Sequence, residues 1–126
     1  AHGDELARVV RLMLDELGDR ALLRHWSAVT PDAATGSPTH LLEVFHPQVN
    51  KWTMIERVAA DHGIAPARIA AIGDEINDVE MIRHAGLGIA MANAAAPIRA
   101  MAARVTASHV EDGVALAVER ILTGEW

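Results

Sequence analysis

The chain has 126 residues, of which 51% are hydrophobic and 3% aromatic, and it carries a net charge of −6 with no cysteine. This length and apolar content suit a globular protein with a real core and argue against disorder. The acidic balance, without a cluster of Lys and Arg, argues against nucleic acid or an anionic membrane as a partner. No apolar run approaches the roughly 20 residues that span a bilayer, and the lack of cysteine excludes disulfides and fits a cytoplasmic protein.

The first third of the sequence predicts a helix followed by an antiparallel hairpin. Apolar residues recur at helical spacing, and then two strand-like runs are separated by residues rich in turn formers. The predicted elements are a helix over 4–17, strands over 22–29 and 40–45, and a loop over 31–38. The pattern breaks at His46-Pro47, and this break predicts a boundary between domains over 1–46 and 47–126.

The rest of the sequence alternates between helical patterns and short apolar runs. Such alternation is typical of βαβ units, so it predicts an α/β fold with a Rossmann-like parallel sheet whose two faces are buried. The predicted helices cover 51–62, 76–85, 95–103 and the region around 114–122, and the predicted strands cover 69–73, 86–91 and 104–108.

A cluster of carboxylates follows the first of these apolar strands. Gly73 allows a sharp turn and a close approach, and Asp74 follows it at the carboxyl edge of the predicted sheet, where ligands bind in open α/β folds. Asn77 and Asp78 fall in the first turn of the next predicted helix, and Lys51 opens the preceding helix. Oxygen ligands at this density suit Mg²⁺, and a lysine there can face a phosphate oxygen. The same Gly-Asp pattern also occurs as a plain turn and helix cap.

The residues around this cluster resemble the haloacid dehalogenase-like phosphatases, with the best match to the Cof-like branch. The resemblance is specific over residues 43–122, whereas residues 1–42 fit the end of that branch's cap domain by order and secondary structure only. The matching segments are Gly73 to Ile82 and Ala85 to Ala94 for the fourth motif, Val49-Asn50-Lys51 for the third, and Val105 to Ser108 with Glu111 to Ala115 for the closing segment.

The resemblance implies a fold, an activity and a set of site residues. The fold is the C-terminal half of the family's core domain, preceded by a remnant of an α/β cap. The activity is Mg²⁺-dependent hydrolysis of a small phosphorylated metabolite such as a sugar phosphate, through an aspartyl-phosphate. By position, Lys51 and Asp78 are the catalytic residues, Lys51 and Asn77 bind phosphate, and Asp74, Asn77 and Asp78 hold the metal.

One departure from the family changes the expected function. The family's nucleophile comes from an Asp-x-Asp motif, and the sequence contains none; Asp78-x-Glu80 is the nearest pattern and belongs to the fourth motif. We therefore expect the isolated chain to be inactive, and we expect it either to be a fragment of a longer hydrolase or to self-associate. In both cases the partner would cover an exposed edge of the sheet.

Two other interpretations stay open. The chain could be a non-catalytic module that binds metal or phosphate or serves in assembly, although the intact site residues argue mildly against this, namely Lys51, Asp74, Asn77 and Asp78. The phosphorylation domain of a P-type ATPase shares the Gly-Asp-x-x-Asn-Asp pattern, but the absence of a membrane segment and the match at Asn50-Lys51 disfavour it. The seven histidines show no pairing typical of zinc sites.

Overall fold

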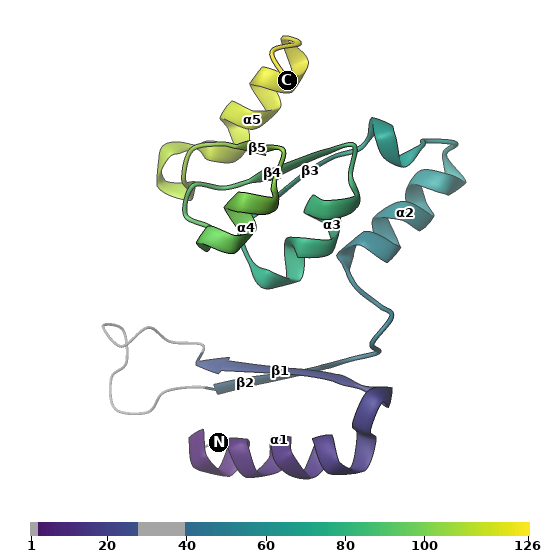
Figure 1. Ribbon diagram of the computed structural model, residues 1–126, viewed down its shortest axis with the longest axis vertical. Helices are drawn as coiled ribbons and strands as arrows, with labels where there is room; N and C mark the ends of the chain where they lie inside the picture. The colour runs from purple at the N-terminus through teal and green to yellow at the C-terminus, as the bar shows by residue number, and fades with distance from the viewer. Residues whose placement is uncertain (1–2, 28–39) are drawn as a thin grey trace. The chain divides into compact units, whose positions relative to one another are not determined.

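The computed structural model describes residues 3–27 and 40–126 (Figure 1). The chain forms two compact units, Ala1–Val49 and Asn50–Trp126. This division lies close to the predicted break after residue 46, and the assignment of the two parts to a cap and a core stays a prediction. The predicted loop over 31–38 and the last two residues of the predicted strand over 22–29 lie outside the described residues. No helix in the described part of the chain is long and apolar enough to cross a membrane.

The first unit contains a helix and a two-stranded antiparallel sheet. Helix α1 ends where Gly18 adopts a left-handed conformation with φ of 53°, which glycine accepts without strain. In the sheet, Leu22 lies opposite Phe45. The predicted helix and the predicted antiparallel pairing are confirmed. The elements are α1 (Gly3–Leu17), a 3₁₀ turn η1 (Gly18–Arg20), β1 (Leu22–Ser27) and β2 (His40–Phe45).

The second unit carries a three-stranded parallel sheet in the order β3-β4-β5. Gly73 at the end of β3 lies opposite Ala90 in β4, and Ala90 lies opposite Val105 in β5, so the three strands end at one edge. The elements are α2 (Lys51–Asp61), η3 (Pro66–Arg68), β3 (Ala70–Gly73), η4 (Ile76–Asp78), α3 (Val79–His84), β4 (Leu87–Ala90), α4 (Ala96–Met101), β5 (Arg104–Val105), η5 (His109–Glu111) and α5 (Gly113–Leu122). The predicted α/β class and parallel sheet are confirmed.

Several predicted boundaries were wrong. The helix predicted over 76–85 begins as the 3₁₀ turn η4, so Asn77 and Asp78 precede α3 instead of forming its first turn. The strand predicted over 104–108 has two residues, because Thr106 turns inward and its hydroxyl donates a hydrogen bond to the Gly113 carbonyl at 2.7 Å. The helix predicted over 95–103 is three residues shorter than expected. The strands predicted over 69–73 and 86–91 are shorter by one and two residues, whereas the strand predicted over 40–45 has the predicted bounds.

The core of the second unit lies between the sheet and its helices. In Figure 1, α3 and α4 lie on one side of the sheet and α5 on the other. Ile89, in the central strand, is completely buried. Gly88 has no room for a side chain, because a Cβ there would overlap the carbonyl oxygen of Ile82. The buried side chains around α3 form two clusters, one of Ile82, Ala90, Ala94 and Ile98 and one of Trp52, Ala71 and Met81.

Truncating a buried side chain of the central strand tests this core. We expect Ile89→Ala to lower the free energy of unfolding by about 2–5 kcal/mol, because it leaves a cavity that the short strands cannot close. The matched control is Leu122→Ala, whose side chain is 81% exposed and which we expect to change stability by less than about 0.5 kcal/mol. Urea denaturation followed by NMR signals of the second unit measures both. Equal effects of the two variants would contradict this packing.

Candidate active site

The candidate site lies at the carboxyl edge of the parallel sheet, where β3 ends at Gly73. Turn η4 bends the chain back so that the amide of Asp78 donates to the carbonyl of Glu75 at 2.9 Å. This bend lays the Asp78 side chain over Gly73, where an added Cβ would lie 2.7 Å from Asp78 Oδ2. Glycine is therefore required at the end of β3 because the Asp78 carboxylate occupies the space of a side chain, as the sequence suggested.

Asp78 is the most heavily bonded side chain of the site. It is 4% exposed, and both of its carboxylate oxygens have partners. Oδ1 lies 2.5 Å from Nζ of Lys51. Oδ2 accepts hydrogen bonds from the backbone amides of Asp74 at 3.0 Å and Glu75 at 3.1 Å. A buried carboxylate with this set of donors is held as a charged acceptor.

The pKa of Asp78 follows from two opposing effects. Burial by itself raises the pKa, because it removes water from the charged form. The hydrogen bond from Lys51 and the two backbone amides outweigh burial and hold the pKa below its ordinary value of 3.8. Asp78 is therefore ionised at neutral pH and forms a true ion pair with Lys51.

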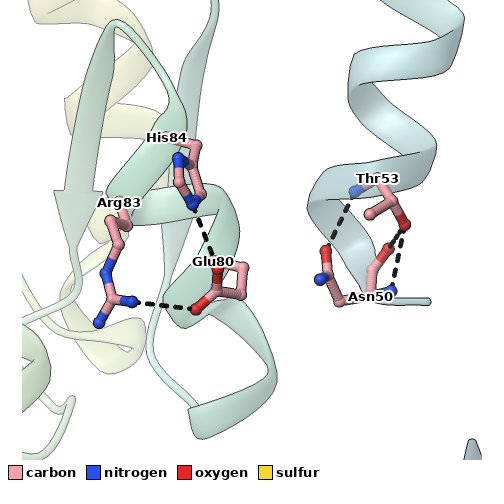
Figure 2. Close-up of polar contacts among 5 residues, drawn as sticks. All are labelled: Asn50, Thr53, Glu80, Arg83 and His84. Carbon is pink, nitrogen blue, oxygen red and sulfur yellow. Dashed lines mark hydrogen bonds and ion pairs between the residues drawn. The ribbon is translucent and has the colours of Figure 1, made fainter. Parts of the chain in front are cut away.

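Lys51 is placed by the start of α2. Asn50 caps the helix: its side-chain oxygen accepts from the amide of Thr53 at 3.0 Å, and the Thr53 hydroxyl accepts from the amide of Asn50 at 3.2 Å (Figure 2). Asn50 is therefore the N-cap of α2. The Lys51 side chain is half-exposed, so its ammonium group contacts Asp78 on one side and keeps access to solvent.

The residue after Lys51 anchors the same end of α2 to the core. Trp52 is 6% exposed and packs with Ala71 and Met81. Its ring stacks on His84, with the ring centroids 5.9 Å apart. Glu80 lies within 3.2 Å of His84 Nε2 and accepts from Arg83 at 3.3 Å (Figure 2). Helices α2 and α3 are thus fixed to each other directly beside the Lys51–Asp78 pair.

Asp74 is held by a residue to which the sequence assigned no role. Asn93 donates from Nδ2 to Asp74 Oδ2 at 2.7 Å and accepts at Oδ1 from the amide of His109 at 3.0 Å. Asn93 follows β4, just as Asp74 follows β3. The rule that parallel strands present their loops at one edge could have placed Asn93 beside Asp74.

The predicted site residues are brought together only in part. Lys51, Asp74 and Asp78 converge within one hydrogen-bonded network, whereas Asn77 is exposed and its side chain makes no hydrogen bond within the described residues. No group of three or more His, Cys, Asp or Glu side chains in residues 3–27 and 40–126 is arranged to hold a metal ion. The assignment of Asp74, Asn77 and Asp78 to metal binding stays a prediction.

The carboxylate oxygens at this edge nevertheless fit part of the coordination shell of a Mg²⁺ ion. Mg²⁺ takes oxygen ligands, keeps several waters and is often bound through one or two carboxylates together with a substrate phosphate. Asp74 is half-buried and uses only Oδ2 in its hydrogen bond to Asn93. It can offer the other oxygen, whereas both oxygens of Asp78 are already engaged.

Comparison with known proteins identifies the family. The sequence model of the haloacid dehalogenase-like hydrolase family matches residues 5–118. The 5-amino-6-(5-phospho-D-ribitylamino)uracil phosphatase YitU of Bacillus subtilis is 37% identical over 92 residues, which cover 73% of this chain and 31% of that protein. The chloroplastic endoribonuclease YBEY of Arabidopsis thaliana is 31% identical over 118 residues, 92% of this chain and 20% of that protein.

A solved structure gives the same result. A haloacid dehalogenase-like hydrolase from Bacteroides thetaiotaomicron superposes with a TM-score of 0.77 and 29% sequence identity, covering 96% of this chain and 41% of that one. The chain therefore belongs to the haloacid dehalogenase-like hydrolases, and the resemblance noted in the sequence is confirmed. It spans about a third of the length of YitU, so the activity of a whole protein is a matter for proposal.

The ion pair of the site predicts a dependence of stability on pH. We expect Asp78→Asn to lower the free energy of unfolding at neutral pH by about 1–3 kcal/mol, because a charge-assisted hydrogen bond to Lys51 is lost. The folded-state pKa of Asp78 is lower than its unfolded value. Its contribution is therefore complete above the unfolded value and is lost as the pH falls through the folded one.

The difference between parent and Asp78→Asn should accordingly shrink below about pH 4. Urea denaturation at several pH values measures it. Asp61→Asn, which alters an exposed carboxylate at the end of α2, serves as the control and should behave like the parent at neutral pH. A difference between parent and Asp78→Asn that stays constant or grows on acidification would contradict the ion pair.

Proposed function

We propose that the chain supplies the lysine and aspartate side of a Mg²⁺-dependent phosphomonoester hydrolase that acts on a small phosphorylated metabolite. The observation that carries this proposal is the Lys51–Asp78 pair at 2.5 Å beside Asp74. Membership of a hydrolase family supports it. The name of YitU, which denotes a phosphatase of a ribityl phosphate, supports the substrate class.

In this proposal each residue has a separate chemical task. The Lys51 ammonium neutralises charge on the phosphoryl group that is transferred, and Asp78 holds Lys51 in place. Asn77, exposed beside them, binds a phosphate oxygen. Asp74 gives a carboxylate oxygen to Mg²⁺, which when bound offsets charge on the same phosphoryl group.

The nucleophile must come from outside these 126 residues, since the sequence has no Asp-x-Asp motif. In the proposed reaction an aspartate oxygen attacks phosphorus and the bond from phosphorus to the ester oxygen breaks. The leaving alcohol takes a proton, and water then hydrolyses the aspartyl-phosphate. The cytoplasmic location expected from the lack of cysteine belongs to this proposal as well.

A second proposal is a non-catalytic module that binds metal or phosphate or that serves in assembly. The network of Lys51, Asp74 and Asp78 is compatible with such a module, because it can hold a phosphate without turnover. The phosphatase proposal accounts better for Lys51, because a half-exposed ammonium held by a buried carboxylate is suited to a phosphoryl oxygen. The relatives give no support to a P-type ATPase.

Restoring the nucleophilic aspartate tests the proposed phosphatase activity. We expect the 126-residue chain alone not to hydrolyse p-nitrophenyl phosphate with Mg²⁺. The chain extended by the coding sequence that precedes it should hydrolyse this ester, and Lys51→Ala and Asp74→Asn should each lower kcat by about a hundredfold or more. The controls are Arg57→Ala and Asp61→Asn, which change exposed residues of the same helix.

Two results of this assay would contradict the proposal. One is turnover by the 126-residue chain that Asp74→Asn abolishes, because it would show a complete site. The other is an extended chain that binds Mg²⁺ and phosphate but never turns over, because this result would favour the binding module.

We further propose that β3 pairs with another strand, from the missing half of the hydrolase or from a second copy. Within the described residues β3 pairs on one side only, with β4, and an unpaired strand edge is a template for association. We expect light scattering after size exclusion to show association, and Ala70→Lys, at an exposed position of β3, to reduce it. The control Ala60→Lys, on the exposed face of α2, should not. A stable dilute monomer would exclude pairing with a second copy.

A further inference from the structure

Asn93 joins two parts of the site that are distant in the sequence. Its side chain reaches Asp74, 19 residues earlier, and the backbone of His109, 16 residues later. Asp74 follows β3, Asn93 follows β4, and His109 opens η5 after β5. One amide group thus connects the loops that follow all three strands of the sheet.

The chemistry of these bonds fixes which way the amide points. The backbone N–H of His109 can only donate, so the amide oxygen must face it. The NH₂ group then faces Asp74 Oδ2, which accepts its hydrogen bond. A flipped amide would oppose donor to donor and acceptor to acceptor. An aspartate or a leucine at position 93 would lose the donor that reaches Asp74.

The anchor at His109 is itself held firmly. The hydroxyl of Ser108 donates to the carboxylate of Glu111 at 2.6 Å, and the amide of Glu111 donates back to the Ser108 carbonyl at 3.1 Å. Gly113 follows with no room for a side chain, because a Cβ there would overlap the carbonyl of Ala107. The turn that presents the His109 amide therefore has little freedom to move away from Asn93.

We propose that Asn93 is a positioning residue: it locks the Asp74 carboxylate through Oδ2 against the start of η5 and so leaves Oδ1 to act as the ligand oxygen. This role rests on the proposed metal-binding function of Asp74. Residues that hold a ligand carboxylate by hydrogen bonds commonly set the metal affinity, because they remove the cost of ordering the ligand at each binding event.

Three variants separate the bonds from one another. Asn93→Ala removes both. Of the two bonds, His109→Pro removes only the one from the His109 N–H, and it also removes the imidazole. The backbone accepts proline there, because Ser108 has φ −74° and ψ 170°, which suits the residue before proline, and His109 is the first residue of a helical turn. His109→Ala keeps the N–H and removes only the imidazole, so it is the matched control for His109→Pro.

Two measurements on the 126-residue chain compare these variants with the parent: the order of the Asp74 side chain and the affinity for a divalent cation. NMR relaxation of the Asp74 side chain reports its order without metal, and EPR titration with Mn²⁺ reports the affinity for a divalent cation. We expect Asn93→Ala and His109→Pro to make the Asp74 side chain mobile and to weaken Mn²⁺ binding, by about tenfold for Asn93→Ala. His109→Ala should match the parent chain in both measurements.

The outcomes distinguish this inference from the proposed function. If Asp74 stays equally ordered in Asn93→Ala and His109→Pro, the positioning role is overturned, whatever the metal does. If Mn²⁺ binding is absent in the parent or survives Asp74→Asn, the metal-binding role of Asp74 fails, while the relaxation data still decide whether Asn93 orders it. Loss of order in both variants with His109→Ala unchanged supports the positioning role.

Discussion

The site depends on a buried carboxylate that must keep its charge. Taking the ionised Asp78 out of water is costly unless every oxygen gains a strong partner. Lys51 and the amides of Asp74 and Glu75 meet this requirement. To do so, the start of α2 must lie against the end of β3, and Gly73 must leave room for the carboxylate. One ion pair therefore fixes the positions of a helix, a strand and a turn.

The same requirement explains which parts of the site the sequence could predict. The sequence predicts Lys51 and Asp74 at one edge because the alternation of helices and strands implies a parallel sheet whose loops gather there. The close approach at Gly73 and the cap at Asn50 follow from local sequence. These features depend on neighbours along the chain or on a general property of parallel sheets.

Other features depend on contacts that the pattern of residues does not encode. The helix predicted from residue 76 starts as a 3₁₀ turn because the Asp78 carboxylate accepts from amides just before it. Such local bonds compete with helix formation. The role of Asn93 needs the actual distance between the loops after β4 and β5. The stacking of Trp52 on His84 requires the packing of α2 against α3. No local sequence signal sets these contacts.

The central claim is that Lys51, held by Asp78, faces a phosphate that Mg²⁺ shares. Lys51 is the single lysine of the sequence, so a lysine-labelled sample gives one side-chain NMR signal. We predict that orthophosphate shifts this signal saturably and that Mg²⁺ tightens phosphate binding. Asp74→Asn should remove only the effect of Mg²⁺ and leave the response to phosphate in place. A Lys51 signal that does not respond to phosphate, with or without Mg²⁺, would contradict the account.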